Sequence, residues 1–314
     1  MLNAMVNTVF YFLLNMSITA SLVGVLLVLL RFNRKISGVG TYALWGLVFV
    51  RLVFPFVLSS EISLFNFAKG LIKKVVPLPD VVPLTRIELT TTNYVGAAKE
   101  YYPVAYKNIF LEKFFGFAAF TWIVVAVAAL LATAIIYNLT RSELQKAQHF
   151  RDNIYVSDTV DTPMVFGVFR PKIIIPPKLN KHSKELEYVL LHEQIHIRRH
   201  DNLFRLLGII TACIHWFNPL VWVFLKLFFK DMELTCDLRA VKHFSKEKRK
   251  DYARALVNLS SNDKVFVSTA FGKTNVKVRV LNVTNYKKMT VMAIVVSIFF
   301  ITAVAAALIT NPIK

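Results

Sequence analysis

The stretch LHEQIHIRRHD, residues 191–201, contains the pattern His-Glu-x-x-His at His192, Glu193 and His196. On a helix, His192 and His196 are one turn apart on the same face, so both imidazoles can bind one metal ion. Glu193 then stands beside that ion, where a glutamate can act as a general base. The helix is predicted independently, because Ser183 is a suitable N-cap and apolar residues follow at helical spacing. We therefore predict a zinc site on a helix that begins after Ser183.

Catalytic zinc keeps three protein ligands and one open position, so a third ligand is expected further along the chain. Glu233 and Asp237 are four residues apart in the stretch Asp-Met-Glu-Leu-Thr-Cys-Asp. On a helix, Glu233 could bind the metal while Asp237 accepts a hydrogen bond from a ligating histidine. Asp201 and Asp231 remain competitors, although we expect Asp201 to be a helix-end residue and Asp231 a solvated charge.

Two other residues near these motifs have alternative interpretations. His200 can be a hydrogen-bond donor in the transition state or an exposed histidine at a helix end, and we favour the second. Cys236 is expected to be a buried thiol and not a ligand. The chain has two cysteines, Cys213 and Cys236, without Cys-x-x-Cys spacing, so nothing indicates an oxidised domain.

Long apolar segments indicate an integral membrane protein. Hydrophobic residues make up 55% of the 314 residues and charged residues 18%, whereas soluble domains carry about 25% charged residues. Segments 5–30, 41–59, 114–137 and 289–309 are long enough to cross a bilayer core of about 30 Å. Arg51, inside the second segment, is expected to face the bundle interior. Four spans place both termini on the same side of the membrane.

Basic residues orient these spans. The connector after the first span carries Arg31, Arg34 and Lys35 and no acidic residue, which is typical of a cytoplasmic connector. Loop 60–113, with 7 basic and 5 acidic residues, is then extracytoplasmic, and segment 140–288, with 26 basic and 14 acidic residues, is cytoplasmic. Both termini are therefore expected outside. The excess of 38 Lys and Arg over 19 Asp and Glu suits anionic lipid, and direct nucleic-acid binding is not expected.

A fifth apolar run, residues 203–229, is broken at Asn218 and Pro219, a pair typical of an N-cap and a first helical turn. If this run crossed the membrane once, Glu233 would lie on the opposite side from His192, and one zinc ion could not bind both. We therefore expect two helices here and no crossing.

Short β-branched or aromatic runs at 153–157, 163–168 and 172–176 predict a small sheet before the zinc helix. An edge strand of this sheet can hold an extended substrate by backbone pairing, or the hairpin can merely cover the helix. The sequence leaves both alternatives open.

Together, these features predict a mainly α membrane protein with four transmembrane helices and a cytoplasmic α+β, gluzincin-like zinc peptidase domain. The expected domains are residues 1–137 with three spans, residues 138–288 with the peptidase, and residues 289–314 with the fourth span.

The chain resembles the integral-membrane zinc peptidases of the beta-lactam sensor-transducer family, the antirepressor-type receptors of Gram-positive bacteria. The resemblance lies in residues 45–55 with RLVFP, 163–176 (PMVFGVFRPKIIIP), 191–201, 215–222 (HWFNPLVW) and 233–237 (ELTCD). It implies zinc ligands at His192, His196 and Glu233, a general base at Glu193, and a supporting role for Asp237. The implied partners are the lipid bilayer, a cytosolic repressor or another protein substrate, and the chain itself.

The sequence differs from the receptors of this family at its end. Those receptors continue past the fourth span into an extracellular penicillin-binding domain with a reactive serine, whereas this chain stops at Lys314. We expect either a truncated piece or a member without that sensor, and no residue here is assigned to beta-lactam acylation.

The expected function is zinc-dependent peptide hydrolysis at the cytoplasmic face, in signalling of the antibiotic-resistance type. Self-cleavage is expected in the connector at about residues 260–283, first at 268–271, because this connector follows the helix with Glu233 and contains a stretch that can lie extended. The alternatives are a housekeeping quality-control peptidase and a non-catalytic signalling scaffold. A homodimer remains open.

Overall fold

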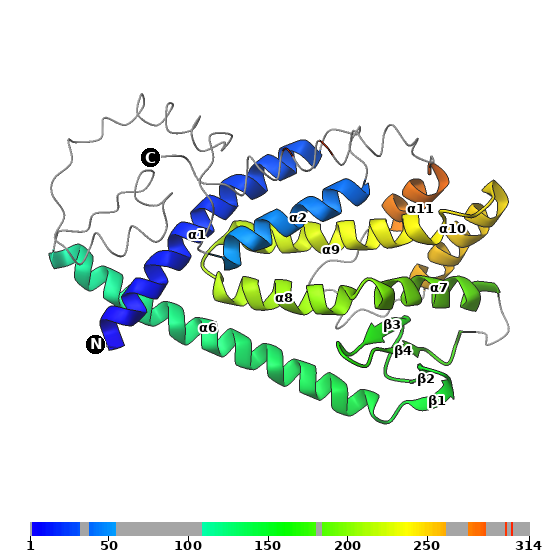
Figure 1. Cartoon of the computed structure of the whole chain (residues 1–314). Coiled ribbons are helices and arrows are strands. Elements are labelled where there is room, and N and C mark those ends of the chain that lie inside the picture. The colour runs from blue at the N-terminus through cyan, green and yellow to red at the C-terminus, as the bar shows by residue number, and fades with distance from the viewer. Residues whose placement is uncertain are drawn as a thin grey trace. The chain divides into compact units, whose positions relative to one another are not determined.

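The computed structural model describes residues 2–31, 38–54, 109–179, 184–286, 299 and 303. Within these residues the chain is mainly helical with one small sheet, as the sequence predicts (Figure 1). The chain divides into two compact units. The first comprises Met1–Ala128, Thr211–Trp222 and Val291–Lys314, and the second comprises Ala129–Ile210 and Val223–Thr290.

The first unit contains α1 (Leu2–Arg31), α2 (Gly38–Val53) and the first part of α6 (Ile109–Leu144). α1 packs against α2. An aromatic cluster joins α1 to α6, because the ring of Phe10 lies 5.3 Å from that of Phe115 and 5.8 Å from that of Trp122. The indole N–H of Trp122 donates to the carbonyl oxygen of Ile214 at 2.8 Å. This bond satisfies a carbonyl group at the C-terminal end of α8 (Asp201–Ile214).

The helix break predicted at Asn218 and Pro219 is confirmed. α8 (Asp201–Ile214) ends before it, and α9 (Pro219–Ala240) begins at the proline. The side-chain oxygen of Asn218 accepts a hydrogen bond from Leu220 N at 3.0 Å and so caps α9. Its amide nitrogen donates to Ser17 Oγ and to Ser21 Oγ on α1, both at 2.7 Å. The expectation that these helices do not cross a membrane stays a prediction.

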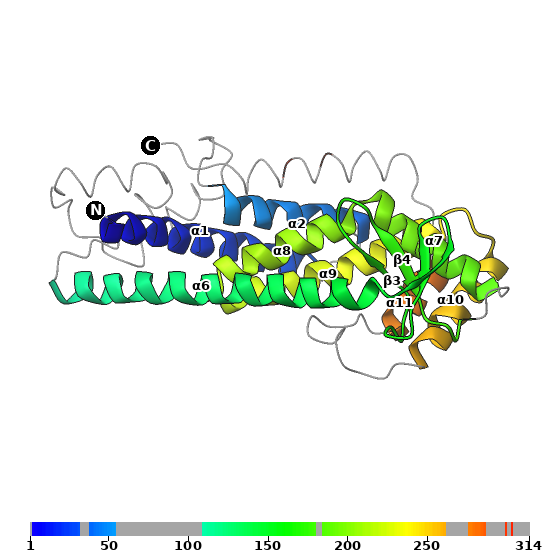
Figure 2. The same cartoon turned by 90° about the horizontal axis from the view of Figure 1, so that it is seen from below.

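Two of the described helices are long and apolar enough to cross a membrane, Met5–Leu29 and Phe115–Leu144, and they overlap two of the predicted spans. α6 is one uninterrupted helix of 36 residues (Figure 2). α2 contains the shorter apolar stretch Tyr42–Val53, in which Arg51 is buried as expected. The predicted fourth span lies almost wholly outside the described residues, as does most of loop 60–113, so both stay predictions.

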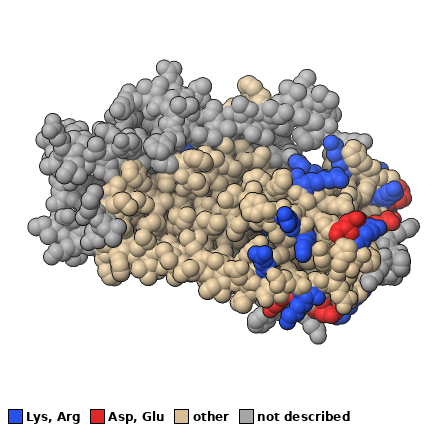
Figure 3. Space-filling view, turned by 60° about the horizontal axis from the view of Figure 1, so that its bottom comes forward, with Lys and Arg blue, Asp and Glu red and all other residues tan. Residues whose placement is uncertain are grey.

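Charged side chains are unevenly distributed on the described surface. In the view of Figure 3 they gather in one region, and much of the remaining described surface carries no Lys, Arg, Asp or Glu. Large apolar side chains are exposed along α6, among them Phe117, Phe120, Leu131, Ile135 and Leu139. Because such a surface is unfavourable in water, it favours a lipid environment.

The second unit carries a four-stranded sheet of order β1-β2-β4-β3. The strands are β1 (Gln148–Arg151), β2 (Ile154–Val156), β3 (Met164–Phe166) and β4 (Lys172–Ile175). β1 and β2 form an antiparallel hairpin, β2 and β4 run parallel, and β3 pairs antiparallel with β4. Three strands confirm the predicted runs. β1 escapes prediction because its four residues include a single apolar one.

α7 (Lys184–Arg198) packs against β3 and β4 and also against α10 (Lys246–Ser261) (Figure 1). Towards the sheet, Leu186, Val189 and Leu190 join a core cluster with Ile173 and Ile175 of β4. Away from the sheet, Ile195 joins a second cluster with α9, α10 and α11 (Val276–Thr284). Because both sides of α7 are packed, the rotation of this helix is fixed, and with it the direction of its histidines.

The structure shortens the expected connector 260–283. Its last part is helical, because Val280 and Val283 recur at helical spacing and pack into the cluster with Cys236. Val283 is fully buried. Only residues 262–275 remain as a connector between α10 and α11, and they lie outside the described residues, as do 268–271 and the predicted N-cap Ser183.

Candidate metal centre

His192 and His196 lie one turn apart on α7 and are buried, with 7% and 5% of their surface exposed. Their Nε2 atoms are 3.1 Å apart. Glu233 of α9 approaches both, since its Oε2 lies 3.4 Å from His192 Nε2 and its Oε1 lies 3.5 Å from His196 Nε2. Two imidazole nitrogens and one carboxylate therefore converge in the second unit.

This set of donors fits a zinc ion. Zinc is bound tetrahedrally by histidine nitrogen and carboxylate oxygen at about 2.0–2.2 Å, which places neighbouring ligand atoms about 3.3–3.6 Å apart. The three separations of 3.1, 3.4 and 3.5 Å are close to that spacing. Hard cations such as Mg²⁺ prefer oxygen ligands, so two imidazoles favour zinc.

Each imidazole is held through its other nitrogen. His196 Nδ1 lies 2.6 Å from Asp201 Oδ2, and His192 Nδ1 lies 2.9 Å from the hydroxyl oxygen of Tyr252. When Nδ1 carries the proton, it donates to these oxygens, and Nε2 presents its lone pair. In this tautomer both imidazoles direct Nε2 towards Glu233.

Asp237 lies behind His192 and is fully buried. Its Oδ1 is 3.3 Å from His192 Nδ1 and accepts a hydrogen bond from the Tyr252 hydroxyl at 2.8 Å. Burial alone would raise the pKa of Asp237, but the guanidinium of Arg279 lowers it to about 2. The carboxylate is therefore ionised at neutral pH, and it approaches His192 both directly and through the Tyr252 hydroxyl.

Glu233 is held by Arg205 of α8, whose guanidinium forms an ion pair with Oε1. Burial alone would raise the pKa of Glu233, but interactions with His196, His192 and Arg205 lower it well below its ordinary value. Glu233 is therefore ionised, as a carboxylate ligand must be.

Cys236 is a second candidate for the third ligand. With His192 and His196 it forms a group whose ligand atoms all lie within 4.8 Å of one another. Its thiol donates to the carbonyl oxygen of His192 at 3.4 Å, and the residue is fully buried, as expected. We favour Glu233, because its oxygens are 3.4 and 3.5 Å from the two Nε2 atoms.

A pocket of about 360 Å³ opens beside His196. Its lining residues come from β3 and the turn after it, and from the end of α7 and the start of α8: Val165, Gly167, Val168, Phe169, Pro171, His196, Ile197, His200, Asn202 and Leu203. The Asn202 amide donates to Val165 O at 3.0 Å and to Gly167 O at 2.9 Å, which ties the end of β3 to α8. The pocket therefore leaves open space next to His196.

Two residues of α7 and the turn after it complete this region. Glu193 is 8% exposed and adjoins His192, and its role as general base stays a prediction. His200 is an exposed residue between α7 and α8 that lines the pocket. Its φ of 55° lies in the left-handed region, which is uncommon for a residue with a side chain. The structure agrees with a helix-end histidine, and a transition-state role stays open.

Asp201 lies at a helix end, as the sequence predicts, because it begins α8. It is also fully buried and holds His196. Asp231 differs from the prediction. Asp231, expected as a solvated charge, is 4% exposed. The reason is tertiary packing, because Met232 and Thr235 beside it on α9 are also buried.

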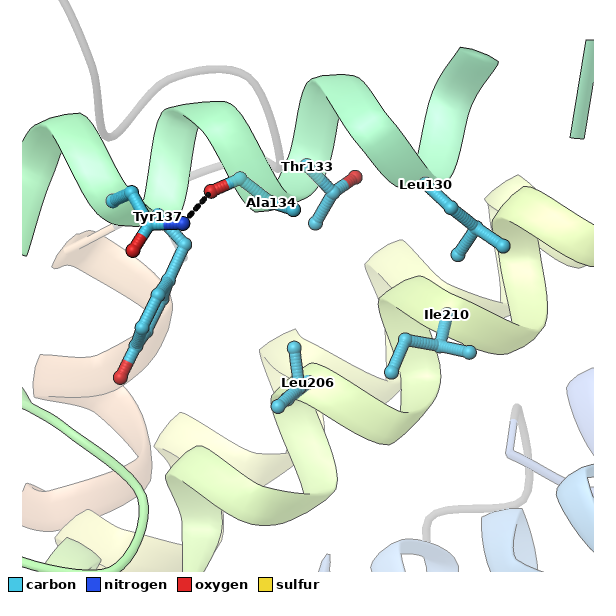
Figure 4. A pocket seen from close by; sticks show the side chains of 7 residues that line it. Leu130, Thr133, Ala134, Tyr137, Leu206 and Ile210 are labelled. Atoms are coloured by element: carbon cyan, nitrogen blue, oxygen red, sulfur yellow. Dashed lines mark hydrogen bonds between the residues drawn. The ribbon is translucent and has the colours of Figure 1, made fainter. Parts of the chain in front are cut away.

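A second pocket, of about 270 Å³, lies between α6 and α8 (Figure 4). Its lining is mostly apolar: Leu130, Thr133, Ala134, Tyr137, Asn138, Leu206 and Ile210. The Asn138 amide already donates to Ala134 O at 2.9 Å. This lining contains no imidazole, thiol or carboxylate, so the candidate chemistry belongs to the pocket beside His196.

The sequence model of the BlaR1 peptidase M56 family matches residues 11–283. The chain belongs to this family. The match includes His192, Glu193, His196, Glu233 and Arg279, so the BlaR1 peptidase M56 region spans the whole candidate metal centre. Membership of this peptidase family and the two helices long enough to cross a bilayer together support a membrane-associated metallopeptidase.

Individual curated relatives are also similar to this chain. The methicillin resistance mecR1 proteins of Staphylococcus aureus and Staphylococcus epidermidis are each 24% identical over 269 residues, which cover 79% of this chain and 46% of the relative. The regulatory protein BlaR1 of Bacillus licheniformis is 30% identical over 138 residues, 42% of this chain and 23% of the relative. The chain thus spans less than half of the length of the curated relatives it matches.

Proposed function

We propose that this chain is a membrane-embedded zinc endopeptidase that acts at the cytoplasmic face, with one zinc ion bound by His192, His196 and Glu233. The observation that carries the proposal is the convergence of three donor groups from α7 and α9, separated by 3.1–3.5 Å. Membership of a peptidase family is independent support. The combination of His-Glu-x-x-His with a glutamate from a later helix is that of a gluzincin-like peptidase.

The remaining groups of the centre have distinct tasks in peptide hydrolysis. Bound zinc would supply a Lewis acid that polarises the scissile carbonyl group and a water molecule. Glu193 takes a proton from the attacking water and delivers it to the leaving amine nitrogen, so that a C–O bond forms as the C–N bond breaks. Asp201 and Tyr252 keep the two imidazoles oriented throughout, and Asp237 anchors the Tyr252 hydroxyl.

The proposed substrates are extended polypeptides. β3 is the last strand in the order of the described sheet and borders the pocket beside His196, and an extended peptide can pair with such an edge. One substrate is the connector 262–275 of the chain itself, cut first at 268–271. It follows α10, whose Tyr252 lies in the centre, so its local concentration there is high. A cytosolic repressor is the second proposed substrate.

The proposed setting is signalling across the membrane in antibiotic resistance. Two relatives are named for methicillin resistance and another is named as a regulatory protein. In this arrangement the spans are residues 5–30, 41–59, 114–137 and 289–309, both termini are extracytoplasmic, and the peptidase is cytoplasmic. The excess of basic residues in segment 140–288 supports that orientation.

The test compares wild-type protein with Glu193→Gln, which keeps the size of the side chain but removes the base. Both are purified in detergent, incubated with zinc and examined by intact mass. We expect a fragment that ends between residues 262 and 275 in the wild type only. The same fragment from both proteins would assign the cut to a contaminating protease. Proteins retained by Glu193→Gln in cells then identify further substrates.

A further inference from the structure

α11 is attached to the helices that carry the candidate centre. Its Asn282 amide donates to the carbonyl oxygen of Leu234 on α9 at 3.0 Å. Just after α11, the carbonyl oxygen of Tyr286 accepts a hydrogen bond from Arg249 of α10 at 3.0 Å, and the guanidinium of Arg249 lies over the Tyr286 ring. With the buried Val283, these contacts hold α11 in one position against α9 and α10.

Arg279 of α11 reaches into the centre from this position. Its Nε donates to Asp237 Oδ2 and its Nη2 donates to Asp237 Oδ1, both at 2.7 Å. This two-point contact fixes the plane of the carboxylate, which a single contact would leave free to turn. Only 18% of the Arg279 side chain and none of the Asp237 side chain is exposed, so water competes weakly for the pair.

The contact continues to a proposed metal ligand. Asp237 Oδ1 accepts the Tyr252 hydroxyl at 2.8 Å, and that hydroxyl lies 2.9 Å from His192 Nδ1. Arg279, Asp237, Tyr252 and His192 come from α11, α9, α10 and α7, respectively. A single chain of hydrogen bonds thus joins four helices and ends on the imidazole.

We propose that Arg279 is a positioning residue for the metal centre: by fixing Asp237 it sets Tyr252 and the imidazole of His192, and it makes the geometry of the centre depend on the docking of α11. This inference rests on the proposed function, because it concerns the same zinc site. It assigns no direct contact with the substrate to Arg279.

The position of Arg279 in the sequence gives this arrangement a regulatory consequence. His192, Glu233, Asp237 and Tyr252 all precede residues 262–275, whereas Arg279 follows them. A cut in that connector leaves the metal ligands on one fragment and Arg279 on the other. From then on, only noncovalent docking of α11 keeps Arg279 against Asp237.

Electrostatics and positioning predict opposite effects of neutralising Arg279. Its Nη2 is 3.3 Å from His192 Nε2 and its Nη1 is 3.8 Å from Glu233 Oε2, so its charge by itself repels a cation bound there. If charge were all that mattered, Arg279→Gln would bind zinc more tightly. If positioning dominates, Arg279→Gln binds zinc more weakly, by the 10- to 100-fold typical of residues that orient metal ligands.

The experiment measures zinc affinity by competition with a chelator, and the visible spectrum after cobalt substitution, in the full chain with Glu193→Gln to prevent self-cleavage. We expect about 10- to 100-fold weaker zinc binding and an altered cobalt spectrum in Arg279→Gln, with partial rescue in Arg279→Lys. The control Arg239→Gln removes an exposed charge from the helix that carries Asp237 and should change neither measurement.

A double variant tests whether weaker zinc binding in Arg279→Gln comes from misfolding around an unpaired buried charge. Asp237→Asn with Arg279→Gln leaves no unpaired buried charge, and its zinc affinity should match that of Arg279→Gln alone, because both changes break the same chain of contacts. Unchanged or tighter zinc binding in Arg279→Gln overturns the inference while leaving the proposed function intact. A wild-type protein that binds no zinc contradicts the proposed function. In that case hydrogen exchange of the α9 amides still tests the role of Arg279. Faster exchange in Arg279→Gln supports the inference that Arg279 holds Asp237, and unchanged exchange overturns it.

Discussion

His196 Nδ1 lies 2.6 Å from Asp201 Oδ2, and Arg199 Nε lies 3.2 Å from the other oxygen of the same carboxylate. Asp201 is fully buried at the first position of α8, directly after the turn that ends α7. The turn between the two helices therefore returns a carboxylate to the histidine that precedes it, and fixes the tautomer that presents Nε2.

Replacing Asp201 with asparagine should weaken zinc binding about 10- to 100-fold, because the amide keeps the shape of the side chain but removes the charge that holds His196. Zinc per chain after a chelator challenge measures the effect. Asp158→Asn removes an exposed aspartate of the same unit and is the matched control. Equal zinc retention in both variants would show that Asp201 does not support the ligand.

The choice between Glu233 and Cys236 as third ligand can be decided by a pair of variants. Cys236→Ala should keep one zinc per chain, because its thiol is engaged with the carbonyl oxygen of His192. Glu233→Gln should lose most of its zinc, because the remaining two histidines leave the site incomplete. Metal analysis of the purified proteins gives the answer, and the reverse pattern would assign the third ligand to Cys236.

The pocket beside His196 should control access of substrate without affecting the metal. Leu203→Trp places a larger side chain in the lining of this pocket. We expect a KM raised about 10-fold or more for a peptide with the sequence of residues 262–275, since about 1.4 kcal/mol of lost binding corresponds to that factor. Zinc content should equal that of the wild type. An unchanged KM would place the substrate elsewhere.

Asn218 should contribute to stability through two separable roles. Asn218→Ala removes both the cap of α9 and the bonds to Ser17 and Ser21, whereas Asn218→Asp keeps an oxygen for the cap and removes the amide donors. Loss of an N-cap costs about 1 kcal/mol. We therefore expect the midpoint of thermal unfolding in detergent to fall most in Asn218→Ala and less in Asn218→Asp. Equal midpoints in the two variants would show that the cap contributes nothing.

Local sequence patterns were sufficient for several elements of the second unit and for the pairing of its histidines. The i, i+4 spacing of His192 and His196 needs only a helix to bring both imidazoles to one face, and α7 supplies it. Asn218 and Pro219 likewise act within one turn, where a cap and a fixed φ determine that α9 starts there. Such features depend on neighbours in sequence, so they can be predicted without knowledge of the tertiary contacts.

Only the tertiary structure determines which residues hold the ligands of the candidate metal centre. Tyr252 and Arg279 reach His192 from 60 and 87 residues further along the chain, and no repeat or spacing in the sequence marks them. The burial of Asp231 and the helix at 276–284 also depend on how α9 and α11 pack. Hydrophobic burial selects which helix faces meet, and only that meeting determines which polar side chains become partners, because hydrogen bonds act over about 3 Å and require both groups to be in place.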